Sequence, residues 1–222
     1  MDWTALWVSL RLGLGTTALA VPLGLCLGHA LAYRNFRGKA LVEALATVPL
    51  VLPPTVLGFY FLTLFGARSP LGAAYTAMTG TTLVFSFEGL LLASVLANIP
   101  FVVQPIQRGF EAIPSDLRDA ASCCGLTPWR RFVQVELPIA WRSVLTGAVL
   151  TFAHTLGEFG VILMVGGNLP GETRTLSVAI YDRMQAFDDH AAAVMAATLL
   201  VVSVATLMAT TALTQRIGAR RG

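Results

Sequence analysis

Charged residues are scarce in this sequence. Asp, Glu, Lys and Arg make up 12% of the 222 residues, against roughly 25% in a typical soluble domain, while 55% are hydrophobic. Mean hydropathy is correspondingly high, at +0.71. So few charges cannot cover a water-facing surface of this size. The composition therefore excludes an ordinary soluble protein and predicts one that resides in the lipid bilayer.

Cysteine is also rare, and its placement excludes a disulfide framework. The three cysteines are Cys26, inside an apolar run, and the adjacent pair Cys123 and Cys124. This spacing matches no structural zinc site either. His154 and Glu158 are four residues apart, but the pair lacks a third ligand. We therefore predict no metal site, and small apolar cysteines in a reduced compartment.

A nucleotide-binding P-loop is missing as well. That loop needs the pattern G-x-x-x-x-G-K-[ST]. The chain has one lysine, Lys39, with Tyr33 where the first glycine belongs and Ala40 where the hydroxyl belongs. No H-E-x-x-H or Ser-Lys arrangement is present. We expect no enzyme activity and no cofactor, so any energy from ATP must come from a partner subunit.

What the sequence has in abundance is long apolar runs, and five of them reach the roughly 20 residues needed to cross a bilayer as a helix. They cover residues 12–33, 43–65, 89–110, 144–166 and 191–213. Backbone groups in lipid must bond within their own segment, so each run is predicted to be helical. The fold class is therefore all-α, a polytopic membrane protein with about five transmembrane helices and residues 1–222 forming one domain.

Prolines interrupt the second run in mid-membrane. Pro53 and Pro54 follow Pro49, and Thr55 comes directly after them. Such a break is tolerated where a cavity or a neighbouring helix satisfies the freed backbone groups. We therefore predict that Pro53, Pro54 and Thr55 line a translocation path.

Basic residues determine the predicted orientation. Eleven Lys and Arg residues lie after the first, third and fifth runs, including Arg216, Arg220 and Arg221. Three lie in the segments on the other side, and Arg11 lies at the outer edge of the first run. The positive-inside rule then places the N-terminus outside and the C-terminus in the cytoplasm of a multi-pass inner-membrane protein. Basic residues placed this way do not indicate binding to nucleic acid.

Five helices are few for enclosing a path. The odd number leaves no complete internal duplication, and no inverted repeat is visible. We therefore expect a homodimer that encloses the path on its two-fold axis.

The longest polar segment, residues 111–143, follows the third run on the cytoplasmic side. Ser115 is predicted to cap a helix over 116–124 that ends at Gly125. Thr127-Pro128 is predicted to start a second helix, and Leu137-Pro138 marks the return to the membrane. A helix, a glycine turn and another helix form a short rigid projection from the bilayer.

This projection resembles the EAA motif of bacterial ABC importer permeases. The matching residues are Asp119, Ala120, Ala121, Gly125, Leu137 and Pro138. Asp119 stands where the family has Glu, and Cys123-Cys124 precede the glycine. The resemblance implies a coupling helix that docks into a separate ATPase subunit, with the small alanines allowing close approach. A helical hairpin that packs only on its own domain is the alternative.

Two further stretches resemble the molybdate branch of the same family. They are residues 49–58 and the region from Leu156 to Thr175, with Pro-Gly-Glu-Thr-Arg-Thr at its end. The resemblance implies a path for molybdate or tungstate and a periplasmic or lipoprotein solute-binding protein. Glu172 and Arg174, in the external loop, are candidates for contacting it. A sulfate or thiosulfate permease is the alternative, and an ATP-independent secondary transporter is another.

The fourth run offers a stripe of polar residues. Gly147, Thr151, His154 and Glu158 recur at helical spacing and so share one predicted helix face. Thr151, His154 and Glu158 are predicted to belong to the path or its gate. Because Glu158 repels an anion, pairing with a basic or N–H group is its alternative role. His154 fits the path and a bond to a neighbouring helix equally well.

Overall fold

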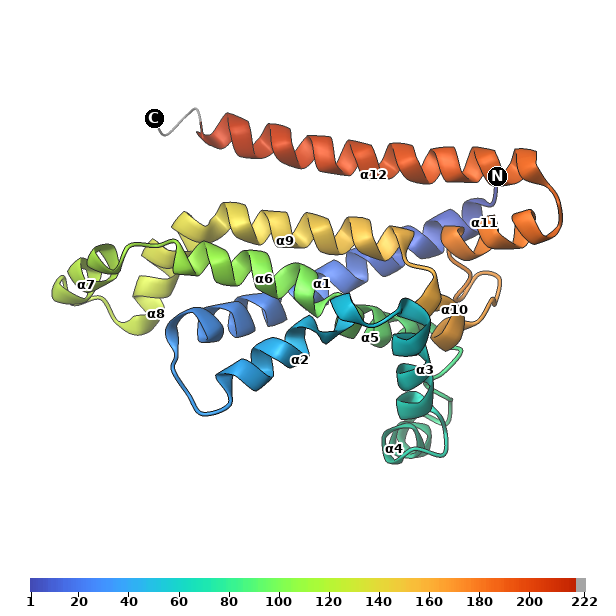
Figure 1. Cartoon of the computed structure of the whole chain (residues 1–222), viewed down its shortest axis with the longest axis horizontal. Coiled ribbons are helices and arrows are strands. Elements are labelled where there is room, and N and C mark those ends of the chain that lie inside the picture. Colours follow the sequence, from blue (N-terminus) through green and yellow to red (C-terminus); the bar gives the residue numbers. More distant parts are fainter. Residues whose placement is uncertain (219–222) are drawn as a thin grey trace.

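The computed structural model describes residues 1–218, and every regular element in that part of the chain is helical (Figure 1). The helices are α1 (Trp3–Tyr33), α2 (Lys39–Val51), α3 (Pro54–Phe65), α4 (Pro70–Thr79), α5 (Phe87–Ala97), α6 (Ile99–Glu111), α7 (Ser115–Cys123), α8 (Pro128–Arg131), the π-helical segment η1 (Phe132–Glu136), α9 (Leu137–Gly157), α10 (Gly160–Gly166), α11 (Leu176–Gln185) and α12 (Asp189–Gly218). The all-α prediction is confirmed.

The expected five spans are present in the described residues, three of them as long helices. Trp3–Tyr33, Pro128–Gly157 and Asp189–Met208 are each long and apolar enough to cross a membrane. Two bent pairs supply the others: α2 with α3, and α5 with α6. The first span starts nine residues before the predicted position 12, because the outer turns of α1 stay helical as far as the cap at Asp2.

Helices α1, α6 and α9 pack together as the centre of the molecule. Their shared core contains Ala20, Leu31, Val102, Val103, Ile106, Phe110, Ile113 and Ala140. Small residues allow this approach, as is usual between membrane helices. A Cβ on Gly28, for example, would lie 3.0 Å from the backbone nitrogen of Gln107.

The prolines of the second span break it sharply. Helices α2 and α3 meet at Leu52-Pro53 with a bend of 116°. Pro53 lacks an N–H and takes an extended conformation, so α2 ends before it and α3 starts at Pro54. Pro22 and Pro105, by contrast, remain inside α1 and α6. The predicted interruption of the second span is therefore confirmed, whereas proline does not end the helix of the first span.

The fourth span is broken where the sequence predicted a continuous helix. Helix α9 ends at Gly157, Glu158 is extended, and α10 restarts at Gly160. The Ser177 hydroxyl donates to the carbonyl oxygen of Glu158 at 2.7 Å, which satisfies a backbone group that the break leaves free. The prediction of one continuous helix over residues 144–166 was therefore wrong.

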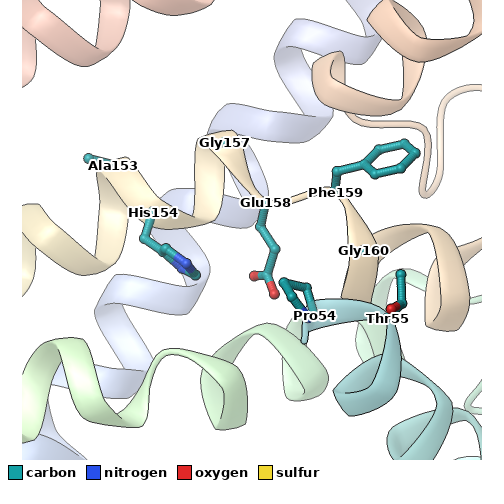
Figure 2. Close-up of a pocket in the computed structure, with 8 residues that line it drawn as sticks. All are labelled: Pro54, Thr55, Ala153, His154, Gly157, Glu158, Phe159 and Gly160. Atoms are coloured by element: carbon teal, nitrogen blue, oxygen red, sulfur yellow. The ribbon is translucent and has the colours of Figure 1, made fainter. Parts of the chain in front are cut away.

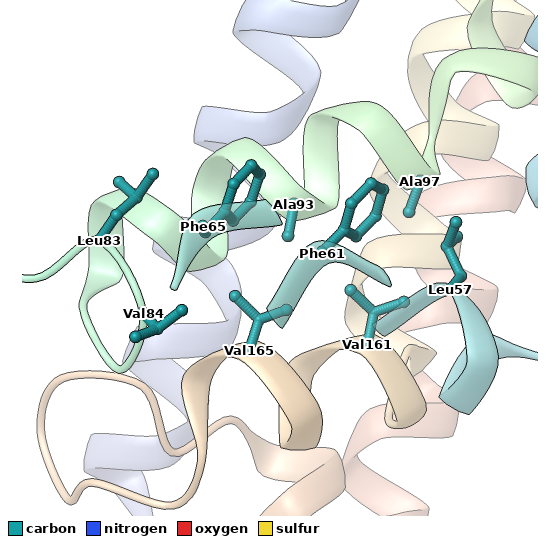
Figure 3. Close-up of a cluster of buried hydrophobic side chains, with 9 residues drawn as sticks. All are labelled: Leu57, Phe61, Phe65, Leu83, Val84, Ala93, Ala97, Val161 and Val165. Atoms are coloured by element: carbon teal, nitrogen blue, oxygen red, sulfur yellow. The ribbon is translucent and has the colours of Figure 1, made fainter. Parts of the chain in front are cut away.

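A second apolar cluster holds the bent segments in place (Figure 3). Its buried residues come from α3, α5, α10 and the segment before α5: Leu57, Phe61, Phe65, Leu83, Val84, Ala93, Ala97, Val161 and Val165. Helix α3 packs closely on α10. The broken helices are thus fixed against each other and not loosely hinged.

The long axis has two distinct ends (Figure 1). The N-terminus lies near α11 at one end, while α7 and α8 project at the other, where α12 also finishes. Helix α12 lies along α9 and α11 and buries few of its residues. Arg220 and Arg221, which entered the orientation argument, lie outside the described residues, as does the side chain of Arg216.

Candidate translocation path and cytoplasmic projection

The two broken spans meet at a cavity of about 480 Å³ (Figure 2). Its lining residues are Pro54, Thr55, Ala153, His154, Gly157, Glu158, Phe159 and Gly160. Four of the six predicted path residues are therefore brought together: Pro54, Thr55, His154 and Glu158. Pro53 and Thr151 are not in this lining.

Gly160 allows the two breaks to come this close. A Cβ at this position would lie 2.7 Å from the Pro54 Cβ and 3.0 Å from the Thr55 backbone nitrogen. The first turn of α3 therefore reaches the start of α10 without an intervening side chain. Pro54 has no N–H, and the N–H groups of Val56 and Leu57 bond the carbonyl oxygen of Pro53. The start of α3 therefore presents the N–H of Thr55 and the positive end of a helix dipole to the cavity.

His154 is held on one side of this cavity. Its Nδ1 lies 3.1 Å from Oδ1 of Asn98, at the junction of α5 and α6, and its ring stacks on Phe101 with centroids 4.0 Å apart. The Asn98 amide in turn donates to the carbonyl oxygen of Ser94 at 2.8 Å. His154 thus bonds a neighbouring helix, one of the two roles considered for it, and also lines the cavity.

Glu158 is buried without a bonding partner for its carboxylate. It is 7% exposed, and its Oε2 has no hydrogen-bond partner among the described residues. Figure 2 shows the carboxylate directed towards Pro54, on the side of the cavity that α3 forms. A basic group paired with it is absent from the described part of this chain. The side chain therefore places an uncompensated acid at the cavity wall.

The segment predicted to be cytoplasmic folds as the expected helix, turn and helix. Gly125 has a positive φ of 77°, and the N–H of Leu126 bonds the carbonyl oxygen of Ala121, so α7 ends in a glycine-dependent Schellman turn. Thr127 caps α8 by accepting from the N–H of Arg130. The cap predicted at Ser115 was wrong: α7 begins one residue earlier, with Pro114 at the cap position and Ser115 already helical.

The outer face of this projection is exposed. Asp119, Ala120 and Gly125 are exposed, while Ala121 is buried against the rest of the projection. Trp129 is 72% exposed, which is unusual for so large an apolar side chain in contact with water. This segment therefore keeps a free surface and is not folded away within its own bundle.

Leu137 and Pro138 lie where the projection joins the membrane helix. The five residues before them, η1, form a π-helical turn in which the Leu137 N–H bonds the carbonyl oxygen of Phe132. The chain is helical from Pro128 to Gly157 without a gap. Widened turns of this kind are frequent at functional sites. The projection and α9 are thus one continuous rod.

At the opposite end, the outer loop carries Glu172 and Arg174. Arg174 donates to Oδ2 of Asp182 at 2.8 Å and to Oδ1 of Asn168 at 2.6 Å. Glu172 is exposed. Arg174 therefore fixes the shape of this loop, and Glu172 extends from it.

A sequence profile described as "Binding-protein-dependent transport system inner membrane component" matches residues 20–219 of this chain. The chain belongs to this family. It is an inner-membrane, multi-pass component of a binding-protein-dependent transport system, consistent with the five spans and the projecting loop.

Several curated transport permeases are similar to this family member. It is 44% identical over 187 residues to the molybdenum transport system permease protein ModB of Azotobacter vinelandii, covering 84% of this chain and 83% of that protein. It is 34% identical to ModB of Escherichia coli strain K12, covering 93% and 89%. It is also 33% identical to a probable sulfate transport system permease protein cysT of Anthoceros angustus, covering 81% and 62%.

Solved transporters share its fold. A bacterial alginate ABC transporter in complex with an alginate-bound periplasmic protein matches with a TM-score of 0.78 at 16% identity, covering 96% of this chain and 78% of the other. The inward-facing MetNI methionine ABC transporter matches with a TM-score of 0.71 at 16% identity, covering 97% and 94%. These matches establish the architecture of an ABC transporter permease.

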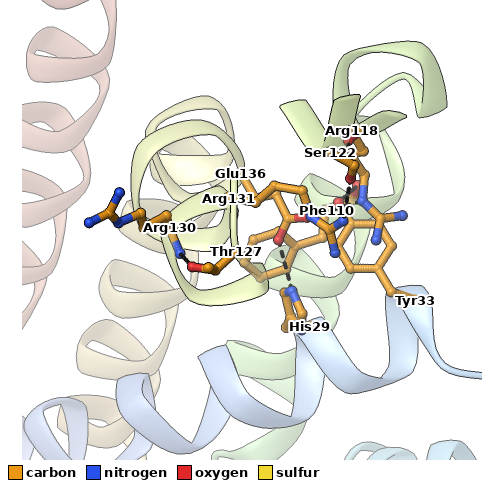
Figure 4. Close-up of polar contacts among 9 residues, drawn as sticks. All are labelled: His29, Tyr33, Phe110, Arg118, Ser122, Thr127, Arg130, Arg131 and Glu136. Carbon is orange, nitrogen blue, oxygen red and sulfur yellow. Dashed lines mark hydrogen bonds and ion pairs between the residues drawn. The ribbon is translucent and has the colours of Figure 1, made fainter. Parts of the chain in front are cut away.

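Sequence reasoning missed one feature of this permease: a buried acid at the base of the projection. Glu136 is 0% exposed and lies between Arg118, Arg131 and His29 (Figure 4). An acidic residue flanked by apolar residues next to an arginine pair was the available signal. His29, on α1, bonds this acid at 2.8 Å.

Proposed function

We propose that this chain is the membrane-spanning permease subunit of an ATP-binding-cassette importer that carries molybdate, or its near-isostere tungstate, into the cytoplasm. The observation that carries the proposal is the exposed helical projection at residues 115–138, on a chain whose remaining helices suit lipid. Membership in the family of binding-protein-dependent transport components supports the same function. The exposed Asp119, Ala120 and Trp129 offer an ATPase partner a rigid surface.

The cavity between the broken spans fits an anion path. The start of α3, with the N–H of Thr55 and the positive end of the helix dipole, lies at its wall, and such helix ends attract oxyanions. No arginine or lysine lines it, so an anion is not trapped there. Glu158 opposes anions at the same wall, and we assign it the role of the gate. Pro53, Pro54, Thr55, Thr151 and His154 complete the proposed path, the buried hydroxyl of Thr151 also having no partner in the described residues.

Molybdate is favoured over sulfate by the relatives. The molybdenum permeases are 34% and 44% identical to this chain, whereas the sulfate permease relative is 33% identical and shares a smaller part of its own length. We expect uptake of labelled molybdate by the reconstituted permease, ATPase and binding protein. A tenfold excess of sulfate should leave that uptake nearly unchanged, and tungstate should compete fully. Full competition by sulfate would assign the chain to the sulfate branch.

Two copies of the chain would enclose the path. Helices α2 and α3 expose large apolar side chains that a single copy leaves unpaired, among them Leu41, Leu45, Val51, Phe59 and Tyr60. We propose a homodimer with the two cavities facing its two-fold axis. The solute-binding protein would dock at the opposite end from α7 and α8, where Arg174 shapes the loop and Glu172 extends from it. A charge reversal at Arg174 that leaves transport and docking unchanged would remove that loop from the docking surface.

The proposed orientation places α7 and α8 in the cytoplasm and the N-terminus outside. Native cysteines test it, because Cys123 and Cys124 are exposed at the end of α7. In a Cys26→Ser background, we expect a membrane-impermeant thiol reagent to label inside-out vesicles and not intact spheroplasts. Labelling of intact spheroplasts would invert the topology. A Cys123→Ser, Cys124→Ser double variant is the matched control and should stay unlabelled in both preparations.

A further inference from the structure

Glu136 forms the centre of a buried polar cluster (Figure 4). Its Oε1 accepts from Nε of Arg118 at 3.0 Å and from Nε of Arg131 at 3.1 Å. Its Oε2 lies 2.8 Å from Nε2 of His29. Glu136 is buried while its three partners are partly exposed, and charge-assisted bonds of this length to a buried carboxylate hold the partners in fixed positions.

Tyr33 completes the cluster from the end of α1. The guanidinium of Arg118 lies 3.5 Å from the centroid of its ring, a cation–π contact. The Tyr33 hydroxyl donates to the carbonyl oxygen of Phe110, in α6, at 2.8 Å. His29, Tyr33, Arg118, Arg131 and Glu136 are called the coupling joint below.

The joint connects elements that the chain does not connect locally. Helix α7 is already tied by short segments to α6 on one side and to α8 on the other. Its link to α1 is different, because Arg118 and Tyr33 are far apart in the sequence. Arg118 is the residue of α7 that reaches both Tyr33 on α1 and Glu136 in η1. A displacement of α7 therefore reaches α1 through this side chain.

One face of helix α7 is exposed, and the other packs against the body of the protein. Asp119 and Ala120 are exposed, whereas Arg118 and Ala121 face the body of the protein. Helix α1 packs against α6 and α9, and α9 carries the cavity residues His154 and Gly157 at its far end. The inward face of α7 thus leads, through α1 and α9, to the wall of the path.

We propose that Arg118 and Glu136 are positioning residues that make α1 move together with the projection, so that ATP hydrolysis by the partner is converted into opening of the path. The proposal rests on the permease function proposed above. It assigns the transmission step to a side-chain joint in addition to the continuous rod from α8 to α9. Loss of the coupling joint should uncouple ATP hydrolysis from molybdate transport without preventing assembly of the complex.

The test uses the full complex of permease, ATPase and binding protein in proteoliposomes, with ATP hydrolysis and molybdate uptake measured together. Arg118→Gln removes the ion pair and the ring contact, yet leaves Arg131 to balance the charge of Glu136. We expect the complex to assemble and its basal hydrolysis to stay within about twofold of wild type. Molybdate carried per ATP hydrolysed should fall at least tenfold. Arg142→Gln, an exposed arginine on α9 outside the joint, is the control and should behave as wild type.

Tyr33 supplies a second pair of variants that does not disturb the buried charges. Tyr33→Phe keeps the ring under Arg118 and should retain most of the transport per ATP. Tyr33→Leu keeps bulk but loses the ring, and should lower the molybdate carried per ATP hydrolysed as Arg118→Gln does. If Tyr33 acted only in folding, both variants would assemble less well and the ratio of molybdate transported to ATP hydrolysed would stay unchanged.

Three outcomes would contradict the proposed role of the coupling joint. One is a normal transport-to-hydrolysis ratio in Arg118→Gln, and another is equal behaviour of Tyr33→Phe and Tyr33→Leu. The third is loss of ATPase binding in Arg118→Gln, which would make Arg118 a docking residue. Each leaves the permease function intact as long as the wild-type complex transports molybdate. Failure of the wild-type complex to bind an ATPase or transport molybdate would instead defeat the proposed function.

Discussion

Replacing Ala120 by Trp is expected to abolish ATP-driven uptake while leaving the protein folded and inserted. Ala120 lies on the exposed face of α7, so a larger side chain meets no part of its own chain that would be displaced. In the proposed complex it would meet the surface of the docked ATPase, where overpacking costs about 1–3 kcal/mol. That cost corresponds to about 5- to 150-fold weaker association. Uptake and co-purification of the ATPase should fall together.

A matched control and a backbone variant sharpen this result. Ala40 is exposed in the first turn of α2, outside the projection, and Ala40→Trp should transport normally. Gly125→Val keeps the docking face but forces a β-branched residue into a positive φ, a strain of about 1–2 kcal/mol that alters the turn. It should also reduce uptake. Normal uptake by Ala120→Trp and Gly125→Val, with the ATPase still bound, would contradict the coupling role of α7.

Replacing Glu158 by Gln is expected to open the path to anions in the absence of ATP. The buried carboxylate faces the cavity without a compensating cation in the described part of the chain. Two unit charges 4 Å apart repel by about 4 kcal/mol at an effective dielectric constant of 20, and a dianion is repelled more strongly. The amide is nearly the same size and carries no charge. We therefore expect ATP-independent molybdate leak to rise at least about tenfold.

This prediction is measured as efflux from molybdate-loaded proteoliposomes that contain the complex without nucleotide. Glu88→Gln, an exposed acid at the start of α5, is the control for loss of a negative charge and should not leak. Glu158→Ala should leak at least as much as Glu158→Gln, since both lack the charge. A tight Glu158→Gln complex that has also lost uptake would show that Glu158 has a structural role and does not gate the path.

The sequence predicted those features that depend on local signals. Long apolar runs identified five spans, and Pro53-Pro54 identified the sharp break in the second. Gly125 and Thr127-Pro128 identified the turn and the second helix of the projection, because a left-handed residue and a hydroxyl cap are determined by a few neighbours. Pro54, Thr55, His154 and Glu158 were each predicted as path residues, and they line one cavity, while their role in transport stays a prediction.

The break after Gly157 was not predicted, because hydropathy adds apolar side chains without sensing backbone bonding. What permits the break is the Ser177 hydroxyl, 19 residues further on, which bonds the carbonyl of Glu158. Similarly, the burial of Glu136 depends on His29 and Arg118, from different helices. No periodicity in one segment encodes such a contact. These features are set by tertiary packing, so single-sequence patterns leave them open.

The docking of the projection to an ATPase is the claim on which the mechanism depends, and a photo-cross-linking amino acid in place of Trp129 tests it most directly. The side chain at this position is 72% exposed at the far end of the projection. In membranes that contain the complete complex, we expect a cross-link to the ATPase subunit that weakens when Ala120 is also replaced by Trp. Cross-links confined to the permease itself, or formed with the solute-binding protein, would contradict the proposed mechanism.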